Sequence, residues 1–431
     1  MVIKNITMKT AILLNEDFLE MRLGLNSTLA YILGAVDLGD EVYLVDVRDE
    51  NKVTLLKKEN CQNLINSYKK ENQNLLNPEL GTEEFVKNVD FTAKEVDFYL
   101  DDCDFLVQRL DPTHAPFPPK GGADYHEFLR EYLVDKNIKN QNFNYPVDCF
   151  LDKELPVKMG LDIEVKSWIS FVGDEGLAKK ALQARDFSGC DKIVLKPDNS
   201  GQSMGVFALE FAENGLDFAG FEEIGLEKLQ ESQIYLAKSD ISEVELQKVI
   251  ELLLFCQSEK FGGEDLALYN SKIIVQPFIE GVKKGDIRVN VAKVAGKFEV
   301  FGVVFRKFAS EDGFTTCVTG GMALPVSILG EITESEIADL SAKTKAAVDL
   351  LNGDLAQKYA RSFELGFDFI LKGDGKTVLL NEVNHACPAL LPVAELIRSE
   401  EDGALDGEFC CEEFEYDGGL ALLKNIMLKN R

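Results

Sequence analysis

Short apolar runs alternate with amphipathic and polar stretches over the first third of the chain, a pattern typical of successive strands and helices. A helix is expected after the first apolar run, where Asn26 or Ser27 is suited to cap it. A polar stretch over 57–77, rich in Lys and Asn, predicts a surface excursion. We therefore expect an α/β domain over residues 1–145 that begins with a βαβ unit. Its predicted strands are 10–14, 42–47 and 104–110.

From about residue 146 the apolar runs lengthen, which indicates strands that pair with their neighbours along the chain. Helical spacing is found over 242–260 and 334–361. Runs of strands with helices set apart indicate an α+β arrangement, which we divide into a central subdomain (146–271) and a C-terminal one (272–431). The predicted strands are 192–196, 205–211, 272–278, 287–294, 298–308, 366–371 and 377–384, the last two forming a hairpin around 372–376.

Charge and composition exclude several classes of function. The chain has 431 residues, with 46 basic and 74 acidic ones and a net charge of −28, so it lacks the basic surface of a nucleic-acid-binding protein. No stretch approaches the roughly 20 apolar residues of a membrane helix, and the N-terminal apolar run is too short for a signal peptide. Nine cysteines without a Cys-x-x-Cys pair predict free thiols and a cytoplasmic protein. Three histidines without a His-Glu-x-x-His motif make a zinc hydrolase improbable.

The C-terminal hairpin carries a candidate metal site. If Asp374 lies at the tip of the turn, Asp368 lies opposite Leu380, and the two-residue period places Leu380, Glu382 and Asn384 on the same face. Two carboxylates and an amide oxygen at such spacing are suited to hard divalent cations. The alternative is a solvated outer face of a hairpin. Because apolar residues adjoin these positions on both strands, both faces are expected to be covered, and metal binding is the better interpretation.

A lysine at a strand end, Lys196, precedes a loop over 197–205 that contains two glycines. Glycines let backbone amides approach phosphate oxygens, and a lysine supplies positive charge, so this loop is a candidate phosphate-binding loop. A plain hairpin turn is the alternative. The loop residues assigned to nucleotide binding are Gly201, Gln202 and Ser203.

The same loop matches the Gly-x-Ser-x-Gly pattern of hydrolase nucleophiles, with Ser203 as the nucleophile. That motif requires a helix after the serine, whereas residues 206–209 have the composition of a strand. A serine hydrolase that uses His385 as its base therefore remains as a minor alternative.

Two further groups of residues could contact a ligand. Gln276, Pro277 and Phe278 end a predicted strand and are followed by Glu280, which together offer backbone edges, an apolar ring and a carboxylate to a nucleotide. Two arginines on adjacent predicted strands are suited to binding phosphate or carboxylate, although each taken alone is more typical of a surface residue. These are Arg288 and Arg306.

The order of these segments resembles that of the ATP-grasp ligases, and within them that of the bacterial glutathione synthetases. The resemblance extends over about 106–388. It rests on Gln108-Arg109-Leu110-Asp111-Pro112, Lys196 with its glycine loop, Gly285-Asp286-Ile287-Arg288, Gly366-Phe367-Asp368, Asn381-Glu382-Val383-Asn384 and Cys387-Pro388. It implies the ATP-grasp architecture, α/β and α+β in several domains, with an N-terminal α/β domain before the ATP-grasp part.

The resemblance also implies the roles of individual residues. ATP phosphates would be bound by Lys153 and Lys196, adenine by Gln276 and Phe278, and the ribose by Glu280. Two magnesium ions, with manganese as an alternative, would be ligated by Asp368, Glu382 and Asn384. Arg288 would hold the transferring phosphoryl group and Arg306 the acceptor carboxylate, while residues 313–321 would form a lid. The remaining substrate contacts would be Arg109, Cys387 and Pro388.

The implied reaction is ATP-dependent amide formation from a small-molecule carboxylate and an amine through an acylphosphate, as in glutathione synthesis from γ-glutamylcysteine and glycine. The chain departs from that pattern in three places. Basic residues are missing from Thr319-Gly320-Gly321-Met322, Cys387 replaces a hydroxyl residue, and the segment 215–271 is long. A nucleotide-binding regulatory protein without ligase activity therefore remains an alternative. The resemblance also implies a homo-oligomer.

Overall fold

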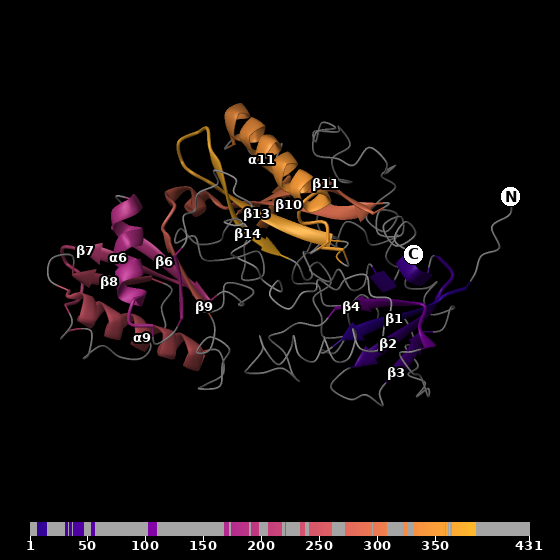
Figure 1. Cartoon of the computed structure of the whole chain (residues 1–431), viewed down its shortest axis with the longest axis horizontal. Helices are drawn as coiled ribbons and strands as arrows, with labels where there is room; N and C mark the ends of the chain where they lie inside the picture. The colour runs from indigo at the N-terminus through magenta and orange to yellow at the C-terminus, as the bar shows by residue number, and fades with distance from the viewer. Residues whose placement is uncertain are drawn as a thin grey trace.

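The computed structural model describes residues 7–46, 53–56, 102–109, 168–260 and 272–384, with gaps inside these ranges of which the longest are 15–30, 198–205, 221–232 and 308–321. Within these residues the chain forms three β-sheets with helices packed against them, a mixed α/β architecture (Figure 1). Each sheet is built from strands of a different part of the chain, so the three sheets define an N-terminal, a central and a C-terminal unit.

The N-terminal sheet has the strand order β3-β2-β1-β4. Strand β1 pairs in parallel with both β2 and β4, and β3 pairs antiparallel with β2. Five of the six residues of β1 are buried, as expected for an inner strand covered on both faces. The parallel β1–β2 pair, with helical residues 31, 32 and 34–36 between them, confirms the predicted βαβ beginning. The strands are β1 (Lys9–Leu14), β2 (Glu41–Asp46), β3 (Val53–Leu56) and β4 (Phe105–Gln108).

The central sheet has the order β5-β9-β6-β7-β8, and two helices cover one of its faces. The boundary predicted at 271/272 falls just before β9, which pairs here with β5 and β6, so this sheet takes strands from both sides of that boundary. The helix predicted over 242–260 is confirmed as α9. The elements are β5 (Trp168–Phe171), α6 (Leu177–Ser188), β6 (Lys192–Pro197), β7 (Phe207–Ala212), β8 (Gln233–Ala237), α9 (Glu243–Lys260) and β9 (Lys272–Pro277).

The C-terminal sheet is antiparallel throughout, in the order β12-β11-β10-β13-β14. The hairpin predicted around 372–376 is confirmed by the pairing of β13 with β14. The elements are η6 (Glu280–Lys284), β10 (Asp286–Val294), β11 (Lys297–Lys307), β12 (Met322–Pro325), α11 (Glu334–Asn352), β13 (Glu364–Leu371) and β14 (Val378–Asn384).

Helix α11 is shorter than the spacing over 334–361 predicted. Its N-terminus is fixed by a capping box, in which the Thr333 side chain accepts from the Glu336 amide and the Glu336 side chain accepts from the Thr333 amide. Gly353 follows the last helical residue as the C-cap, and residues 353–357 form turns. The apolar spacing beyond 352 therefore belongs to a turn segment that packs on the same core, not to helix.

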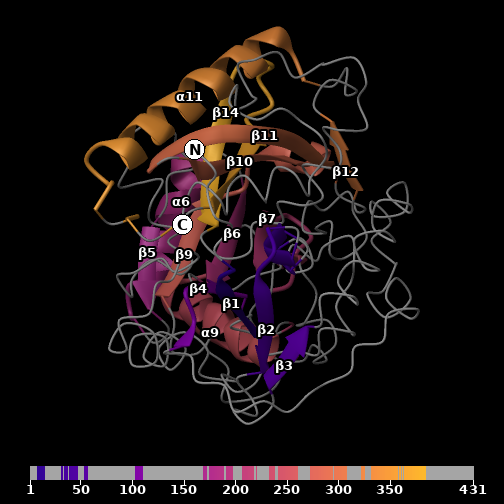
Figure 2. The ribbon, with the colours of Figure 1, turned by 90° about the vertical axis from the view of Figure 1, so that its right-hand side faces the viewer.

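The two faces of the C-terminal sheet differ in chemistry. One face consists of buried apolar side chains that pack with Leu340, Ala347 and Leu351 of α11. Helix α11 lies along the outside of this sheet, and the other two sheets lie on the opposite side of it (Figure 2). The polar face of the sheet is therefore turned toward the rest of the molecule.

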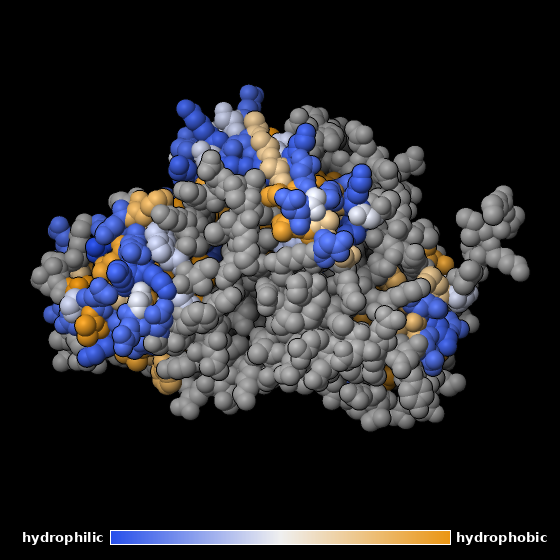
Figure 3. Space-filling view, in the orientation of Figure 1, coloured by the Kyte–Doolittle hydropathy of each residue, from blue (hydrophilic) through white to orange (hydrophobic). Residues whose placement is uncertain are grey.

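The visible surface of the described residues is predominantly hydrophilic over the central unit (Figure 3). The exposed large apolar side chains among the described residues are Phe187 on α6, Tyr235 on β8, and Val244 and Leu252 on α9. Among the described residues, no helix has the length and apolar character that crossing a bilayer requires.

Candidate functional site

The pairing of β13 with β14 brings the predicted metal ligands to one face, although in a different register from the one expected. Asp368 lies opposite Glu382, not opposite Leu380. The register shifts after this pair, because Phe369 pairs with Leu380 and leaves Asn381 as the extra residue of a β-bulge. The prediction that Leu380 shares a face with Glu382 is therefore wrong. The bulge turns Leu380 into the apolar core under α11, while Glu382 stays beside Asp368.

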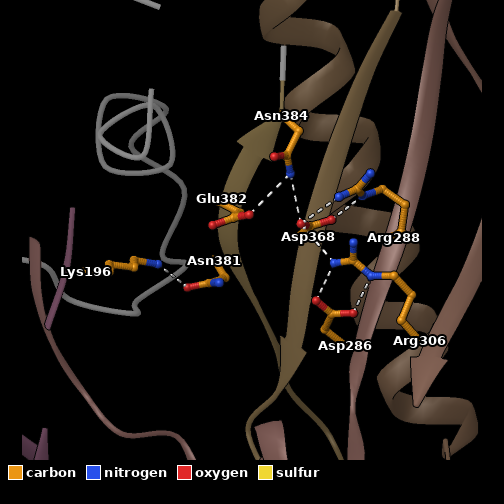
Figure 4. Close-up of polar contacts among 8 residues, drawn as sticks. All are labelled: Lys196, Asp286, Arg288, Arg306, Asp368, Asn381, Glu382 and Asn384. Atoms are coloured by element: carbon orange, nitrogen blue, oxygen red, sulfur yellow. Dashed lines mark hydrogen bonds and ion pairs between the residues drawn. The ribbon is translucent and has the colours of Figure 1, made fainter. Parts of the chain in front are cut away.

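The three oxygen-bearing side chains converge. The Asn384 amide donates to Asp368 Oδ2 over 2.9 Å, and its Nδ2 lies 3.4 Å from Glu382 Oε1 (Figure 4). Asp368 is 2% exposed, whereas Glu382 and Asn384 are half-buried. Two carboxylates and an amide within hydrogen-bond distance form a donor set that fits hard divalent cations. Among the described residues no cluster of three His, Cys, Asp or Glu side chains occurs, so a metal site here depends on the Asn384 oxygen as its third ligand.

Two arginines bind the Asp368 carboxylate. Arg288 donates through Nε to Oδ1 and through Nη2 to Oδ2, the latter over 2.9 Å. Arg306 Nη2 lies 2.9 Å from Asp368 Oδ2, and Arg306 also forms a two-point contact with Asp286, in which its Nε donates to Oδ1 over 2.6 Å. The pairing of β10 with β11 and β13 explains this arrangement, because it places Asp286 opposite Arg306 and Arg288 opposite Asp368. Two carboxylates and two guanidinium groups thus form one buried, charge-balanced cluster.

The cluster perturbs both carboxylates. Burial raises the pKa of Asp368, but the guanidinium groups of Arg288 and Arg306 outweigh it and hold this pKa well below its usual range. Burial also raises the pKa of Asp286, and there it prevails over the opposing effect of Arg306, with the Asp368 charge adding to the rise. Asp368 therefore stays ionised to lower pH than Asp286 does, and an ionised carboxylate is what metal binding requires.

Lys196 connects this face with the central sheet. In β6, Lys192 and Lys196 alternate with Ile193 and Leu195, which pack under α6 and α9, so both lysines lie on the face away from the helices. Lys196 Nζ donates to Asn381 Oδ1 over 2.9 Å. The bulged residue of β14 thus contacts the predicted phosphate-binding lysine directly beside Glu382 (Figure 4).

The strand end predicted to bind a nucleobase lies on the same face of the central sheet. Gln276 is buried, and Phe278 packs its ring under Lys192, whose Nζ lies 4.0 Å from the ring centroid. Glu280 is exposed and forms an ion pair with Lys283, with 2.6 Å between Oε2 and Nζ. Gln276 and Phe278 are therefore near Lys196 on one surface, while Glu280 lies at its solvent edge.

Arg109, predicted to contact substrate, is a buried residue that links the N-terminal and C-terminal units. Its Nη1 lies 3.0 Å from Glu364 Oε1 of β13, and its guanidinium stacks 5.2 Å from the centroid of the Tyr31 ring. The Tyr31 hydroxyl donates to the same Glu364 carboxylate. Glu364 is fully buried, so Arg109 and Tyr31 supply the charge and hydrogen bonds that its burial requires.

Several predicted site residues lie outside the described residues. They are Lys153, Gly201, Gln202, Ser203, the alternative base His385, the substrate residues Cys387 and Pro388, and the lid segment 313–321.

Sequence reasoning missed three polar residues that belong to the site: Asp286, Asn381 and Glu364. Asp286 stands two residues before Arg288, and this spacing could have indicated that both side chains share a face. Asn381 was quoted only as part of a motif, and its role depends on the bulge. Glu364 carries no sequence signal, because its partner Arg109 is 255 residues away.

Residues 183–389 match the family model described as YheC/D-like ATP-grasp, a range that contains every strand of the C-terminal sheet. No curated protein matches the chain at a significant level. Among solved structures, the D-cycloserine synthetase DcsG is 13% identical with a TM-score of 0.51, covering 97% of this chain and 99% of that one. The D-alanine-D-alanine ligase from Coxiella burnetii is 12% identical, with a TM-score of 0.44 and coverage of 88% and 85%. The VanG D-Ala:D-Ser ligase from Enterococcus faecalis is also 12% identical, with a TM-score of 0.46 and coverage of 99% and 100%.

The chain therefore has the ATP-grasp fold in a multidomain α/β setting, which confirms the predicted fold class. Over residues 183–389 it is similar to the ATP-grasp superfamily.

Proposed function

We propose that this chain is an ATP-dependent ligase that joins a carboxylate to an amine through an acylphosphate. The observation that carries the proposal is the convergence of Asp368, Glu382 and Asn384 on one sheet face, with Lys196 of a second sheet bonded to the adjacent Asn381. The proposed metal ligands and the proposed phosphate-binding lysine are then close enough to contact the same bound nucleotide. The ATP-grasp fold supports the nucleotide assignment.

Magnesium ions would be held by Asp368, Glu382 and Asn384, with the asparagine turning its amide oxygen toward the metal. Such ions neutralise charge on the β- and γ-phosphates and orient the γ-phosphoryl group for in-line transfer. The donor set would also accept manganese in place of magnesium. Lys196 would bind phosphate oxygens, and Gln276 with Phe278 would contact the adenine.

The arginines would act by exchanging partners. In the structure Arg288 binds Asp368, and Arg306 binds both Asp368 and Asp286. If Asp368 holds a divalent cation, its attraction for both guanidinium groups would weaken. Arg288 would then be available for the transferring phosphoryl group, while Arg306 would remain bound to Asp286, which positions it to contact the substrate carboxylate. Metal and nucleotide binding would thus be coupled to the separation of Asp368 from both arginines.

The reaction needs no nucleophile from the protein. A substrate carboxylate oxygen attacks the γ-phosphorus, ADP leaves, and the acylphosphate forms. The amine then attacks the acyl carbon, phosphate leaves, and the amine loses a proton to give the amide. The side chains of the site supply positioning and charge neutralisation, which are the main requirements of phosphoryl transfer. The cluster of Asp286, Arg288, Arg306 and Asp368 is charge-balanced, so it would add no net repulsion against the anionic intermediate.

The substrates are proposed by chemical class only. The resemblance to glutathione synthetases makes γ-glutamylcysteine and glycine one pair to test, and the D-alanine-D-alanine and D-Ala:D-Ser ligases suggest amino acids as a second set. The test is an incubation with ATP and magnesium over a matrix of these acids and amines, followed by mass spectrometry. We expect ADP and an amide in equal amounts, both dependent on acid and amine together.

Two variants make this test specific. Glu382→Gln should abolish ADP formation, because it weakens a metal ligand. Asp349→Asn alters an exposed carboxylate on α11, which lies on the opposite side of the sheet, and should leave turnover unchanged. Equal activity of Glu382→Gln and the wild type would refute the metal assignment.

A second candidate is a nucleotide-binding regulatory protein without ligase activity. The observation that favours it is the occupation of Asp368 by both arginines, which leaves the metal ligand engaged. ATP binding by calorimetry without ADP release from any acid and amine pair would support this candidate over the ligase.

A further inference from the structure

The polar face of the C-terminal sheet contains a buried amide that the proposed chemistry does not use. Asn290, in the middle of β10, is fully buried, and neither its Nδ2 nor its Oδ1 has a hydrogen-bond partner. A buried amide left unpaired on both atoms destabilises a protein, and such groups are uncommon in native structures. Asn290 therefore requires a partner that is not a described residue of this chain.

The cross-strand neighbours of Asn290 have no side chains. Its cross-strand partners are Gly302 on β11 and Gly366 on β13. Paired residues of an antiparallel sheet project to the same face, so on both sides the position next to the amide carries no side chain. The Asn290 side chain lies on the same face as Arg288, two residues before it, and away from the core under α11, to which Val289 and Val291 belong.

Asn290 also lies between two polar clusters. One strand step, roughly 7 Å, separates it from Arg288 and its partner Asp368. One step in the other direction lies Ala292, which pairs with Glu364, the residue bound by Arg109 of the N-terminal unit. A ligand group at Asn290 would thus lie between the proposed phosphoryl-transfer centre and the junction with the N-terminal unit.

The chemistry of the amide defines the ligand group. Nδ2 donates and Oδ1 accepts, so a matching group presents an acceptor and a donor side by side. A phosphate or a lone carboxylate would leave Oδ1 facing an anion, and a lone ammonium would leave Nδ2 without an acceptor. Glu364 is paired with Arg109, and Asp368 is neutralised by Arg288 or, in the proposed complex, by a cation, so a group without net charge fits best beside Asn290.

We propose that Asn290 is a specificity-determining residue that binds the co-substrate through a donor–acceptor group without net charge, either an α-amino-acid zwitterion or a carboxamide. The inference rests on the proposed ligase function, because it assigns the substrate group that this site holds beside the reacting centre.

The test compares Asn290→Leu with the wild type. Leucine keeps the approximate shape and removes both polar atoms, which is neutral or stabilising if the amide has no ligand. Thr344→Val is the matched control, because Thr344 is also buried with an unpartnered hydroxyl but lies on α11, within the core on the other side of the sheet. Asn290→Ala is the second variant if leucine prevents folding, since an alanine beside two glycines has no steric conflict on either neighbouring strand.

The probes are glycine, D-alanine, L-alanine and glycinamide, with acetate and ethylamine as compounds that offer only half of the pattern. Binding is measured as a shift of melting temperature in magnesium and a non-hydrolysable ATP analogue. We expect at least one zwitterion or the carboxamide to shift the wild type and Thr344→Val, and neither half-probe to do so. Asn290→Leu should lose this shift and raise the KM of that co-substrate by about tenfold or more, with the KM of ATP unchanged.

Two results would overturn the inference: no probe shifts the wild type, or Asn290→Leu responds to the probes as the wild type does. In the latter case the amide binds only a buried water molecule. Failure of the ligase proposal can be told apart from failure of the Asn290 inference. If the ligase proposal fails, the wild type releases no ADP, whatever the probes do to the melting temperature.

Discussion

Replacing Asp368 by Asn tests whether the charge cluster stabilises the fold as well as the site. Asp368 is 2% exposed and accepts hydrogen bonds from Arg288, Arg306 and Asn384. The substitution removes one of two carboxylates that neutralise the two guanidinium groups and leaves Arg288 facing a neutral amide. Breaking a buried ion pair by removing one partner costs about 3–5 kcal/mol. Against a total stability of about 5–15 kcal/mol, this loss is large enough to measure reliably.

The assay is urea unfolding at neutral pH, in which the midpoint should fall while the slope stays the same. Because the pKa of Asp368 is lowered in the folded protein, its stabilising charge is complete above the unfolded pKa of about 4 and is lost as the pH falls further. The difference between the wild type and Asp368→Asn should therefore shrink below about pH 4. The combined variant Asp368→Leu with Arg288→Met should recover part of the loss, since both charges are gone. Equal midpoints for Asp368→Asn and the wild type at neutral pH would refute the reasoning.

Three further predictions concern single residues. Glu382→Gln should change the unfolding free energy by less than about 1 kcal/mol, because Glu382 is half-buried. It should nevertheless lower kcat by at least about 100-fold at saturating ATP. A large loss of stability that accompanies the loss of kcat would contradict a functional role for this side chain. Gly285→Ala should destabilise by more than about 1 kcal/mol in urea unfolding, because φ is +130° and a Cβ would lie 2.2 Å from the Arg306 carbonyl oxygen; unchanged stability would exclude this backbone geometry. Burial lowers the pKa of Lys293 to about 8, so between about pH 8 and 10 the unfolded chain binds the proton that the folded chain has lost. The wild type should therefore gain stability relative to Lys293→Met over that range, on the order of 2 kcal/mol, and parallel pH profiles of the two proteins would contradict it.

The hairpin shows both the reach and the limit of sequence reasoning. Alternation of apolar and polar residues predicted β13 and β14 to within two residues and placed Asp368, Glu382 and Asn384 on a common face. The same reasoning paired Asp368 with Leu380, because a two-residue period assumes an unbroken ladder. A bulge adds one residue on one strand only, and it is stabilised here by a contact from a different sheet, the Lys196–Asn381 hydrogen bond. Local sequence carries no signal for such a contact.

Contacts between segments far apart in the sequence could not be predicted either. Arg288 and Asp368 are 80 residues apart, and Arg109 and Glu364 are 255 residues apart. Arg109, Arg288 and Asp368 could be recognised as candidates from their type and position in a motif, and Glu364 could not. In each pair the partner follows from strand register and from the packing of one unit on another. The resemblance implied a substrate contact for Arg109 but gave no sign of the partners seen in the structure, where Arg109 is bound to Glu364 and stacked on Tyr31. The short strands β3, β5, β8 and β12 were not predicted, because runs of four or five residues give little periodicity.

The central claim is that the converging face of the C-terminal sheet activates a carboxylate by phosphoryl transfer from ATP. The most direct measurement follows isotopically labelled oxygen from the substrate carboxylate into the released phosphate, using whichever acid and amine pair supports ADP formation. The predicted result is one labelled oxygen in each released phosphate. The oxygen that joins carbon and phosphorus in the acylphosphate comes from the carboxylate, and it leaves with the phosphate when the amine attacks the acyl carbon. Phosphate without label, released alongside ADP, would show that water is the acceptor and would contradict the proposed chemistry.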